Sequence, residues 1–339
     1  MITRKFFAIA LALTVVVTAS FTYLLTASSN ADANVKKTVA KKAVDKAICP
    51  PDFLRLNLGA DYRYISPLLL TEISCVSPEM DSLRMKVTQL INEKKKVGTI
   101  QQASVYLKTI KDGKWFEVNG NQFYNPGSLM KLAILLTYLR EEEKNPGLLE
   151  KELLLSSKIP GPGIDQIRTS APLELNKKYT IKKLLEEMIV NSDNDATQLL
   201  NLNINRVGFT QVMADLGTRT TDIEDPNFEM TVLEYNRYFR VLYNASYLNR
   251  KNSEWALDLL TRANYKNAFM KGIPEGVTAA HKFGERPYEN GFNFHEAGVV
   301  YLKSNPYLLV VMTRGADNTK LPNVVAEISR LCYDEMSGS

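Results

Sequence analysis

The chain has 339 residues, of which 45% are hydrophobic and 23% are charged, a composition typical of a globular protein with a sizeable core. Its net charge of +5 is modest and much of the excess lies near the N-terminus, which argues against a nucleic-acid-binding surface. The only histidines are His281 and His295, so a Ser-His-Asp triad or a metal site built from several histidines is disfavoured.

The first 31 residues are typical of a targeting segment. Arg4 and Lys5 precede an uncharged run from Phe6 to Ala27, and the small residues Ser29-Asn30-Ala31 follow. A run of about 20 apolar residues can span a bilayer, and the flanking positive charges place the N-terminus inside. We predict that residues 1–31 are an uncleaved membrane anchor, with a cleaved signal peptide as the alternative. In both cases the rest of the chain is expected to be extracytoplasmic.

Residues 32–80 are predicted to form a lysine-rich linker and a pre-domain segment. Cys49 and Cys75 lie in this segment, and the third cysteine, Cys332, lies near the C-terminus. Because a disulfide is permitted outside the cytoplasm, we expect Cys49 to pair with Cys75, with two buried free thiols as the alternative. Cys332 is left over in either case.

The first elements of the main domain alternate in type. Amphipathic spacing predicts a helix from Asp81 to Lys95. Two strands are predicted next, Ala103–Ile110 and Lys114–Val118, joined by a hairpin turn at Lys111-Asp112-Gly113. A long apolar stretch that opens at Ser128 and runs to Leu139 then predicts another helix.

The middle of the chain is mostly helical in pattern, with predicted helices at 181–190 (capped by Thr180), 196–200, 230–243 and 253–262. Strand patterns return at 277–283, 297–302 and 307–313, and a helix at 321–333 closes the chain. We therefore predict an α+β fold: an antiparallel sheet flanked by N- and C-terminal helices, with an inserted all-helical lobe.

The predicted domain spans residues 81–339. Its sheet lobe is expected to comprise 81–125 and 264–335, and its helical lobe 126–263. The crevice between two such lobes is the default place for a functional site.

Ser128 and Lys131 form the only Ser-x-x-Lys of the chain. At the first turn of a helix, free N–H groups and the helix dipole favour negative charge on the serine, and a lysine three residues later lies on the same face. A partly buried lysine has a lowered pKa and can take the proton of the serine. Because a chain of this size contains about one such spacing by chance, the assignment depends on partners elsewhere.

Two further segments offer such partners. In Ser192-Asp193-Asn194, the Ser192 hydroxyl could relay a proton to a leaving amine, and the Asn194 amide could orient a substrate and hydrogen-bond the lysine. The alternative is a polar loop that caps the next helix. In Lys282-Phe283-Gly284, Lys282 could hold a substrate carboxylate, and Gly284 would let a substrate backbone approach closely.

The order Ser-x-x-Lys, Ser-Asp-Asn, Lys-x-Gly resembles that of the penicillin-recognising serine hydrolases, the class A β-lactamases and the penicillin-binding D-alanyl-D-alanine peptidases. The resemblance runs from about Asp81 to Tyr333. It is supported by the helical stretch that leads into Ser192 and by His295-Glu296-Ala297-Gly298-Val299-Val300-Tyr301 before the last strand.

The resemblance implies a role for each motif residue. Ser128 would attack a carbonyl and form an acyl-enzyme, Lys131 would act as base, Ser192 would pass the proton to the leaving nitrogen and Asn194 would position the substrate. The oxyanion would bind the backbone N–H groups of Ser128 and of Glu285 or Arg286.

Two departures from the resembled family stand out. Class A β-lactamases activate the deacylating water with a glutamate in a Glu-x-x-Leu-Asn segment, whereas here Met230-Thr231 follows Leu216-Gly217 after only 13 residues. Glu224 is the best substitute in that segment; otherwise it is a loop charge. Second, Phe283 stands where the family usually has Thr or Ser, and an inward-pointing Phe283 should weaken β-lactam binding. His281 and His295 are both predicted to be structural.

Three functions are compatible with these patterns: a β-lactamase-like hydrolase, a cell-wall D-alanyl-D-alanine peptidase with slow deacylation, and a catalytically weak envelope binding protein. The expected partners are a β-lactam or a peptidoglycan stem peptide, and the membrane through the N-terminal segment. We expect a monomer with no nucleic-acid partner, no metal and no organic cofactor.

Overall fold

The computed structural model describes residues 54–55, 62–65, 68–70, 77–158 and 171–338. The predicted anchor, the lysine-rich stretch, Cys49 and Cys75 lie outside the described residues. The chain divides into the units 1–49 and 50–339, and all of the described residues belong to the second. Among them, no helix combines the length and apolar character needed to cross a bilayer.

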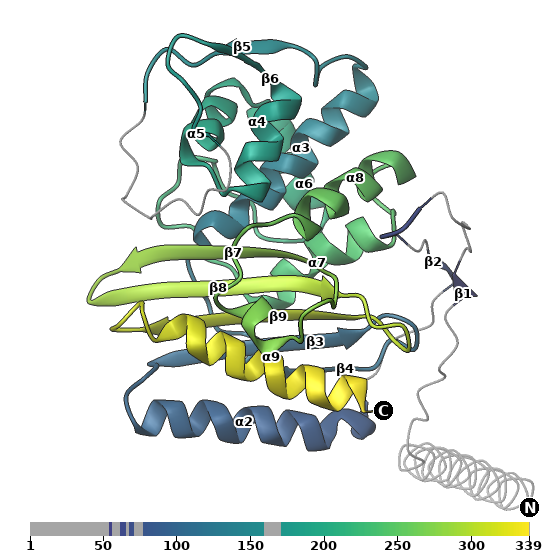
Figure 1. Ribbon diagram of the computed structural model, residues 1–339, viewed down its shortest axis with the longest axis vertical. Helices are drawn as coiled ribbons and strands as arrows, with labels where there is room; N and C mark the ends of the chain where they lie inside the picture. The colour runs from purple at the N-terminus through teal and green to yellow at the C-terminus, as the bar shows by residue number, and fades with distance from the viewer. Residues whose placement is uncertain (1–53, 56–61, 66–67, 71–76, 159–170, 339) are drawn as a thin grey trace, which may run out of the picture. The chain divides into compact units, whose positions relative to one another are not determined.

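A five-stranded antiparallel sheet lies at the centre of the second unit, with the strand order β4-β3-β9-β8-β7 (Figure 1). The strands are β3 (Gln102–Thr109), β4 (Trp115–Val118), β7 (Ala279–Tyr288), β8 (Gly291–Val300) and β9 (Tyr307–Gly315). Strands from both ends of the described chain thus share one sheet, which confirms the predicted α+β architecture.

Both faces of this sheet are buried, as β9 at its centre shows. Leu308 and Val310 belong to one hydrophobic cluster, whereas Leu309 and Val311 belong to a second. Successive side chains of a strand point to opposite faces of the sheet. A nearly continuous apolar strand therefore packs side chains into two hydrophobic cores.

Two helices cover one face of the sheet: α2 (Asp81–Lys96) and α9 (Leu321–Ser337) (Figure 1). The buried face of α2 presents Leu83, Val87 and Ile91, at the spacing of an amphipathic helix. These residues join Val325 and Ile328 of α9 in the second cluster. Cys332, a free thiol, is buried there.

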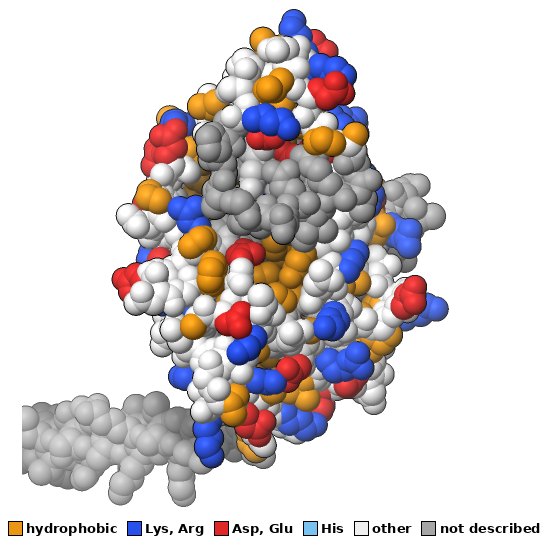
Figure 2. Space-filling view, turned by 60° about the vertical axis from the view of Figure 1, so that its left-hand side comes forward, with side chains coloured by type: hydrophobic (Ala, Val, Ile, Leu, Met, Phe, Trp, Pro, Cys, Tyr) orange, Lys and Arg blue, Asp and Glu red, His pale blue; other side chains and the backbone are white. Residues whose placement is uncertain are grey.

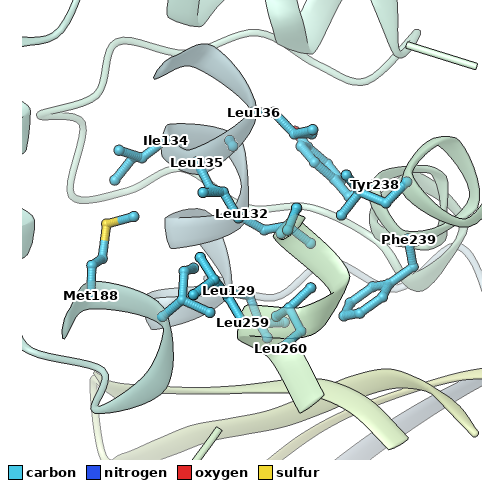
Figure 3. Packing of buried hydrophobic residues seen from close by; sticks show 14 of the residues in the cluster. Leu129, Leu132, Ile134, Leu135, Leu136, Met188, Tyr238, Phe239, Leu259 and Leu260 are labelled. Carbon is cyan, nitrogen blue, oxygen red and sulfur yellow. The ribbon is translucent and has the colours of Figure 1, made fainter. Parts of the chain in front are cut away.

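The opposite face carries the helical layer. It consists of the 3₁₀ helix η3 (Gly127–Met130) and of α3 (Lys131–Lys144), α4 (Ile181–Val190), α5 (Asn194–Asn203), α6 (Arg206–Asp215), α7 (Val232–Tyr243) and α8 (Arg250–Thr261). The first nine residues of α3 are all buried, so α3 is surrounded by the other helices. Figure 3 shows Leu132 and Leu135 of α3 near Met188 of α4, Phe239 of α7 and Leu260 of α8.

Capping residues fix where several of these helices begin. Thr180 accepts a hydrogen bond from Lys183 N, as predicted, and Asp193 and Asn205 cap α5 and α6 in the same way. Thr231 and Glu234 form a reciprocal capping box at the start of α7.

The remaining elements of the described residues are short: β1 (Leu54–Arg55) pairs with β2 (Leu68–Leu70), β5 (Glu152–Leu154) pairs with β6 (Lys178–Thr180), and η2 (Pro78–Met80) and η4 (Phe269–Gly272) are single turns. Residues 63–65 are held against α8, because their backbone N–H groups donate to the carboxylate of Glu254 at 2.5–2.9 Å.

No helix was predicted where α6 lies, and several of the sequence-based element boundaries were also wrong. The β7–β8 hairpin extends well beyond the predicted strand ends, to Tyr288 and back from Gly291. Ser128 lies in a 3₁₀ turn, and the α-helix begins only at Lys131. Met230 pairs with Tyr124 in an isolated bridge, which delays the start of α7 to Val232.

Candidate active site

The turn that carries Ser128 is pressed against the edge strand β7. Gly127 has φ +53°, a backbone conformation that side chains disfavour, and a Cβ there would collide with the Glu285 carbonyl oxygen. A Cβ on Gly284 would collide with the Pro126 carbonyl oxygen. This differs from the expected role of Gly284, because the backbone that approaches it belongs to the protein's own turn rather than to a substrate.

The buried imidazole of His295 holds the same turn in place. His295 of β8 accepts a hydrogen bond from Thr313 N at Nδ1 (3.2 Å), so its proton lies on Nε2, which donates to the Asn125 carbonyl oxygen (3.0 Å). Burial lowers the pKa of His295 to about 4, which keeps the ring neutral. His295 thereby ties the sheet to the segment that leads into Ser128.

Lys131 is buried, with only 4% of its surface exposed. Its Nζ donates to the Ser192 carbonyl oxygen (2.7 Å), to Ser192 Oγ (3.1 Å) and to Asn194 Oδ1 (2.9 Å). Burial lowers the pKa of Lys131 to about 7, because the charged form loses its hydration. A substantial fraction of this amine is therefore neutral near physiological pH.

Lys282 reaches the same serine from the sheet. It is 1% exposed, and its Nζ donates to Ser192 Oγ (3.0 Å) and to the Phe283 carbonyl oxygen (2.9 Å). Burial and then repulsion by Lys131 hold the pKa of Lys282 well below its usual value. The Ser192 hydroxyl thus lies between two amines.

The Ser192 loop is held in an unusual conformation by its neighbours. Ser192 has φ +52°, which costs conformational energy in a non-glycine residue. Asn191 Nδ2 donates to the buried Glu187 carboxylate (2.6 Å), and Asn264 Nδ2 donates to Asn191 Oδ1 (2.6 Å). Sequence reasoning missed these supports. The position of Asn191 next to Ser192 was a usable signal, but nothing in the sequence indicated Asn264.

Phe283 packs away from Ser128. Its ring stacks on Tyr265 (centroids 4.3 Å apart) and joins the second hydrophobic cluster on the α2–α9 face of the sheet. The Lys282 ammonium lies 4.2 Å from the centroid of the same ring, within the range of a cation–π contact. Phe283 therefore contributes an aromatic neighbour to Lys282 and does not line the cavity at Ser128.

His281 belongs to a separate buried group behind Lys282. Its Nδ1 lies 2.6 Å from Glu296 Oε1, while Glu296 Oε2 accepts a hydrogen bond from Phe269 N (2.9 Å). Lys266 Nζ lies 3.3 Å from His281 Nε2. These contacts connect β7, β8 and η4, in agreement with a structural role for His281.

A cavity of about 400 Å³ opens beside Ser128. Lys131, Asn194, Glu285 and Arg286 line it together with Ser128, and the segment 221–228 forms its far wall. The structure therefore brings Ser128, Lys131, Ser192, Asn194 and Lys282 together from η3, α3, the α4–α5 loop, α5 and β7.

Glu224 lines this cavity but is engaged elsewhere. Its carboxylate pairs with Arg206 Nη2 (2.5 Å), and 63% of its side chain is exposed. Asp222 pairs with the same guanidinium at 3.0 Å. Glu285 also lines the cavity, and its side chain accepts a hydrogen bond from Asn318 (3.1 Å).

Comparison with protein families gives a match over residues 82–336 to the family described as "Beta-lactamase enzyme family". No curated protein sequence matches the chain.

Several solved structures share the fold. PBP-A is 19% identical (TM-score 0.66), with 79% of this chain and 100% of PBP-A covered. A mutant of PBP-A, solved as an acyl-enzyme complex with penicillin G, is also 19% identical (TM-score 0.66; 77% and 98% covered). A β-lactamase from Chitinophaga pinensis is 16% identical (TM-score 0.66; 75% and 99% covered).

Proposed function

The chain belongs to the β-lactamase enzyme family and is a β-lactamase-like serine hydrolase; we propose that it works outside the cytoplasm and forms an acyl-enzyme on Ser128. The proposed substrates are β-lactams or related peptide amides. The observation that carries the proposal is the convergence of Lys131 and Lys282 on Ser192 Oγ at the edge of the cavity that Ser128 lines.

In the proposed acylation, Ser128 Oγ forms a bond to the substrate carbonyl carbon while neutral Lys131 takes the hydroxyl proton. The negative charge that develops on the carbonyl oxygen is stabilised by the backbone N–H groups of Ser128 and of Glu285 or Arg286. The carbon–nitrogen bond then breaks, and the proton passes from Lys131 through Ser192 Oγ to the leaving nitrogen. Lys131 ends neutral, and the acyl group remains on Ser128 as an ester.

The 3.1 Å contact between Lys131 Nζ and Ser192 Oγ supports this proton path. Asn194 would orient the substrate amide while its Oδ1 holds Lys131 in place. Lys282 would pair with a substrate carboxylate at the Ser192 end of the site, and the carboxylate would favour the charged form of its amine.

Release of the acyl group has weaker support, and this favours a second candidate, a penicillin-binding D-alanyl-D-alanine peptidase that deacylates slowly when a β-lactam is bound. The observation that favours it is the ion pair of Glu224 with Arg206, because a carboxylate held by a guanidinium is a poor base for water. The intact set of Ser128, Lys131, Ser192, Asn194 and Lys282 argues against a catalytically inert binding protein.

The test is labelling with a fluorescent penicillin, followed over time by intact-protein mass spectrometry. We expect one adduct on the wild-type protein, none on Ser128→Ala, and an adduct that persists for many minutes. An adduct on Ser128→Ala would show that another residue is the nucleophile. Consumption of penicillin with no persistent adduct would identify a β-lactamase, and neither adduct nor consumption would refute both candidates.

The Glu224→Gln variant tests whether Glu224 activates the water that releases the acyl group from Ser128. Because Glu224 is paired with Arg206, we expect the lifetime of the adduct to change less than threefold in this variant. A tenfold or longer lifetime would make Glu224 the deacylating base and favour the β-lactamase.

The extracytoplasmic location rests on residues 1–31 alone. Expression of the full chain with membrane fractionation and N-terminal sequencing tests it. An uncleaved anchor predicts an intact N-terminus in the membrane fraction, and recovery of the protein in the cytoplasmic fraction would contradict the proposal.

A further inference from the structure

A second group of chemically reactive side chains lies outside the cavity at Ser128. It consists of Lys266, His281 and Glu296, which come from the loop between α8 and η4, from β7 and from β8. None of the three lines the cavity beside Ser128. The group places an amine, an imidazole and a carboxylate in the order that activates a nucleophile: the base contacts the nucleophile, and a third group orients the base.

Two hydrogen bonds fix the carboxylate end of the group. Glu296 is fully buried, its Oε2 accepts from Phe269 N (2.9 Å), and its Oε1 lies 2.6 Å from His281 Nδ1. Because an ionised carboxylate only accepts hydrogen bonds, Nδ1 carries the proton of the ring and donates to Glu296. The lone pair of the neutral imidazole is therefore on Nε2.

The imidazole presents this lone pair to Lys266, whose Nζ lies 3.3 Å from His281 Nε2. The ring of His281 is fully buried, and no imidazole reaches the face that Figure 2 shows. Phe269 lies nearly parallel to the ring, with an interplanar angle of 5° and centroids 6.2 Å apart. The base of the group thus has a fixed orientation and is shielded from solvent.

Lys266 is the member of the group that a molecule in solution can reach, because its side chain is exposed. Partial burial of the amine lowers the pKa of Lys266 below its usual value, although the negative charge of Glu296 opposes this change. At a given pH, a larger fraction of this amine is therefore neutral than in an ordinary surface lysine. Only the neutral amine is a nucleophile.

We propose that Lys266 is an acyl-acceptor site, an amine that His281 and Glu296 prepare for reaction with activated esters. The substrate class is an ester or thioester whose leaving group is a weak base. The inference is independent of the proposed acylation of Ser128.

In the proposed step, Lys266 Nζ forms a bond to the ester carbonyl carbon while one of its protons passes to His281 Nε2. Glu296 stabilises the imidazolium that forms. The bond from the carbonyl carbon to the leaving oxygen or sulfur then breaks, and the leaving group takes the proton from His281. An amide remains on Lys266, and His281 is neutral again. Because an amide is stable in water, each protein molecule reacts once.

The test is acetylation of the full chain by 4-nitrophenyl acetate in the Ser128→Ala variant, where an acyl group on Ser128 cannot contribute. Peptide mass spectrometry gives the acetylation rate constant of each lysine at pH 7.5. Lys271 is the internal control, because it is also exposed but its Nζ donates to the neutral Asn323 Oδ1 (3.0 Å). We expect Lys266 to react at least tenfold faster than Lys271. Equal rates would overturn the proposal.

Adding His281→Asn to the Ser128→Ala protein tests the imidazole. Asparagine can still donate to Glu296 from its amide nitrogen, but it presents no base to Lys266. We expect the ratio of the Lys266 rate to the Lys271 rate to fall at least fivefold, with an unchanged circular dichroism spectrum. An unchanged ratio in the folded variant would contradict the role of His281. If this variant does not fold, the ratio measured in Ser128→Ala still decides the proposal.

Adding Lys266→Arg to the Ser128→Ala protein identifies the reacting amine. Arginine keeps a positive charge beside His281 but has no nucleophilic amine at neutral pH. We expect the rapid release of nitrophenol to be lost in this variant. Rapid release that persists would assign the reaction to another residue and would contradict the proposal.

Discussion

Lys131 and Lys282 each donate a hydrogen bond to Ser192 Oγ, and both amines are buried. Burial lowers the pKa of each, and the pKa of Lys282 is lowered further by repulsion from Lys131. At the residue scale, the proposed base Lys131 would therefore act at neutral pH, although a lysine side chain is normally protonated there. In the proposed reaction, the acylation rate would then depend on pH.

We predict that the acylation rate of Ser128 rises with pH through about 7 and levels off above it. The active form is the neutral amine of Lys131, whose pKa burial lowers to about 7, so each proton lost in this range creates a competent base. Stopped-flow fluorescence with a labelled penicillin between pH 5.5 and 8.5 measures this profile. A rate that is flat across pH 7, or an active Lys131→Arg variant, would exclude Lys131 as the base.

His295 gives a second residue-scale prediction, this time for stability. Its pKa is about 4 in the folded protein against about 6.5 in an unfolded chain, so the unfolded state binds the proton first as pH falls. The stability contributed by neutral His295 is complete above pH 6.5 and is lost progressively between pH 6.5 and 4.

The matching variant is His295→Phe, which leaves Asn125 O and Thr313 N without their partner. We expect a loss of about 1–3 kcal/mol in unfolding free energy at pH 7. Urea denaturation at pH 7 and at pH 4.5 measures the unfolding free energy of both proteins. The difference in unfolding free energy between wild type and variant should be about 2 kcal/mol smaller at pH 4.5. A gap that stays constant with pH would show that His295 does not titrate in this range.

At the scale of elements, the contact between η3 and β7 places Ser128 relative to Lys282. Gly127 and Gly284 make this contact possible, because a Cβ at either position would overlap a carbonyl oxygen of the opposite element. The distance between the Ser128 turn and the strand is therefore set by backbone atoms.

We predict that Gly127→Ala and Gly284→Ala each slow acylation by at least tenfold, because η3 must move away from β7. Gly98→Ala is the control for backbone strain: Gly98 has φ +73°, but no atom lies within 4 Å of its Cβ position. It should lose about 1–2 kcal/mol of stability and keep the wild-type acylation rate. Wild-type acylation in both Gly127→Ala and Gly284→Ala would show that the close contact is dispensable.

Elements whose hydrophobic residues recur with the spacing of a helix or a strand could be predicted from the sequence, and the other elements could not. The buried stripe of α2 and the β3–β4 hairpin follow their patterns closely. The far end of β7 was missed because Glu285-Arg286-Pro287 is polar and contains a proline, which an edge strand tolerates.

The residues of the candidate site could likewise be predicted only where a local motif marked them. Motif order predicted Ser128, Lys131, Ser192, Asn194 and Lys282, whereas the anchoring of Asn125 by His295 depends on a contact across 170 residues. Such contacts arise from tertiary packing and leave no local pattern.

At the scale of the whole molecule, a single strand of the described sheet contributes side chains to both hydrophobic clusters. Leu308 and Leu309 of β9 are fully buried, yet their side chains belong to different clusters. Neither the α2–α9 layer nor the helical layer can lose its packing without exposing a face of the same sheet.

We therefore predict a single cooperative unfolding transition for the sheet and the two helical layers that cover it. Leu308→Ala and Leu309→Ala should each cost about 2–5 kcal/mol, as expected for buried leucines, and each should shift the whole transition. Thermal unfolding followed by circular dichroism and by loss of acylation capacity measures both. If the Leu309→Ala protein unfolded in two steps, with acylation surviving the first, the two layers would be independent.

The paired glycines also constrain how this enzyme could change over evolutionary time. A larger residue at either position would displace the proposed nucleophile, so we expect a single substitution there to impair the enzyme until a second, compensating change restores it. The segment 221–228 contacts the turn of Ser128 through a backbone atom, the Pro226 carbonyl oxygen, which accepts a hydrogen bond from Asn125 Nδ2 (2.7 Å), so its side chains are under no such mutual restriction. New substrate preferences would therefore arise most readily by drift in this segment, while the geometry of the reaction centre is inherited unchanged.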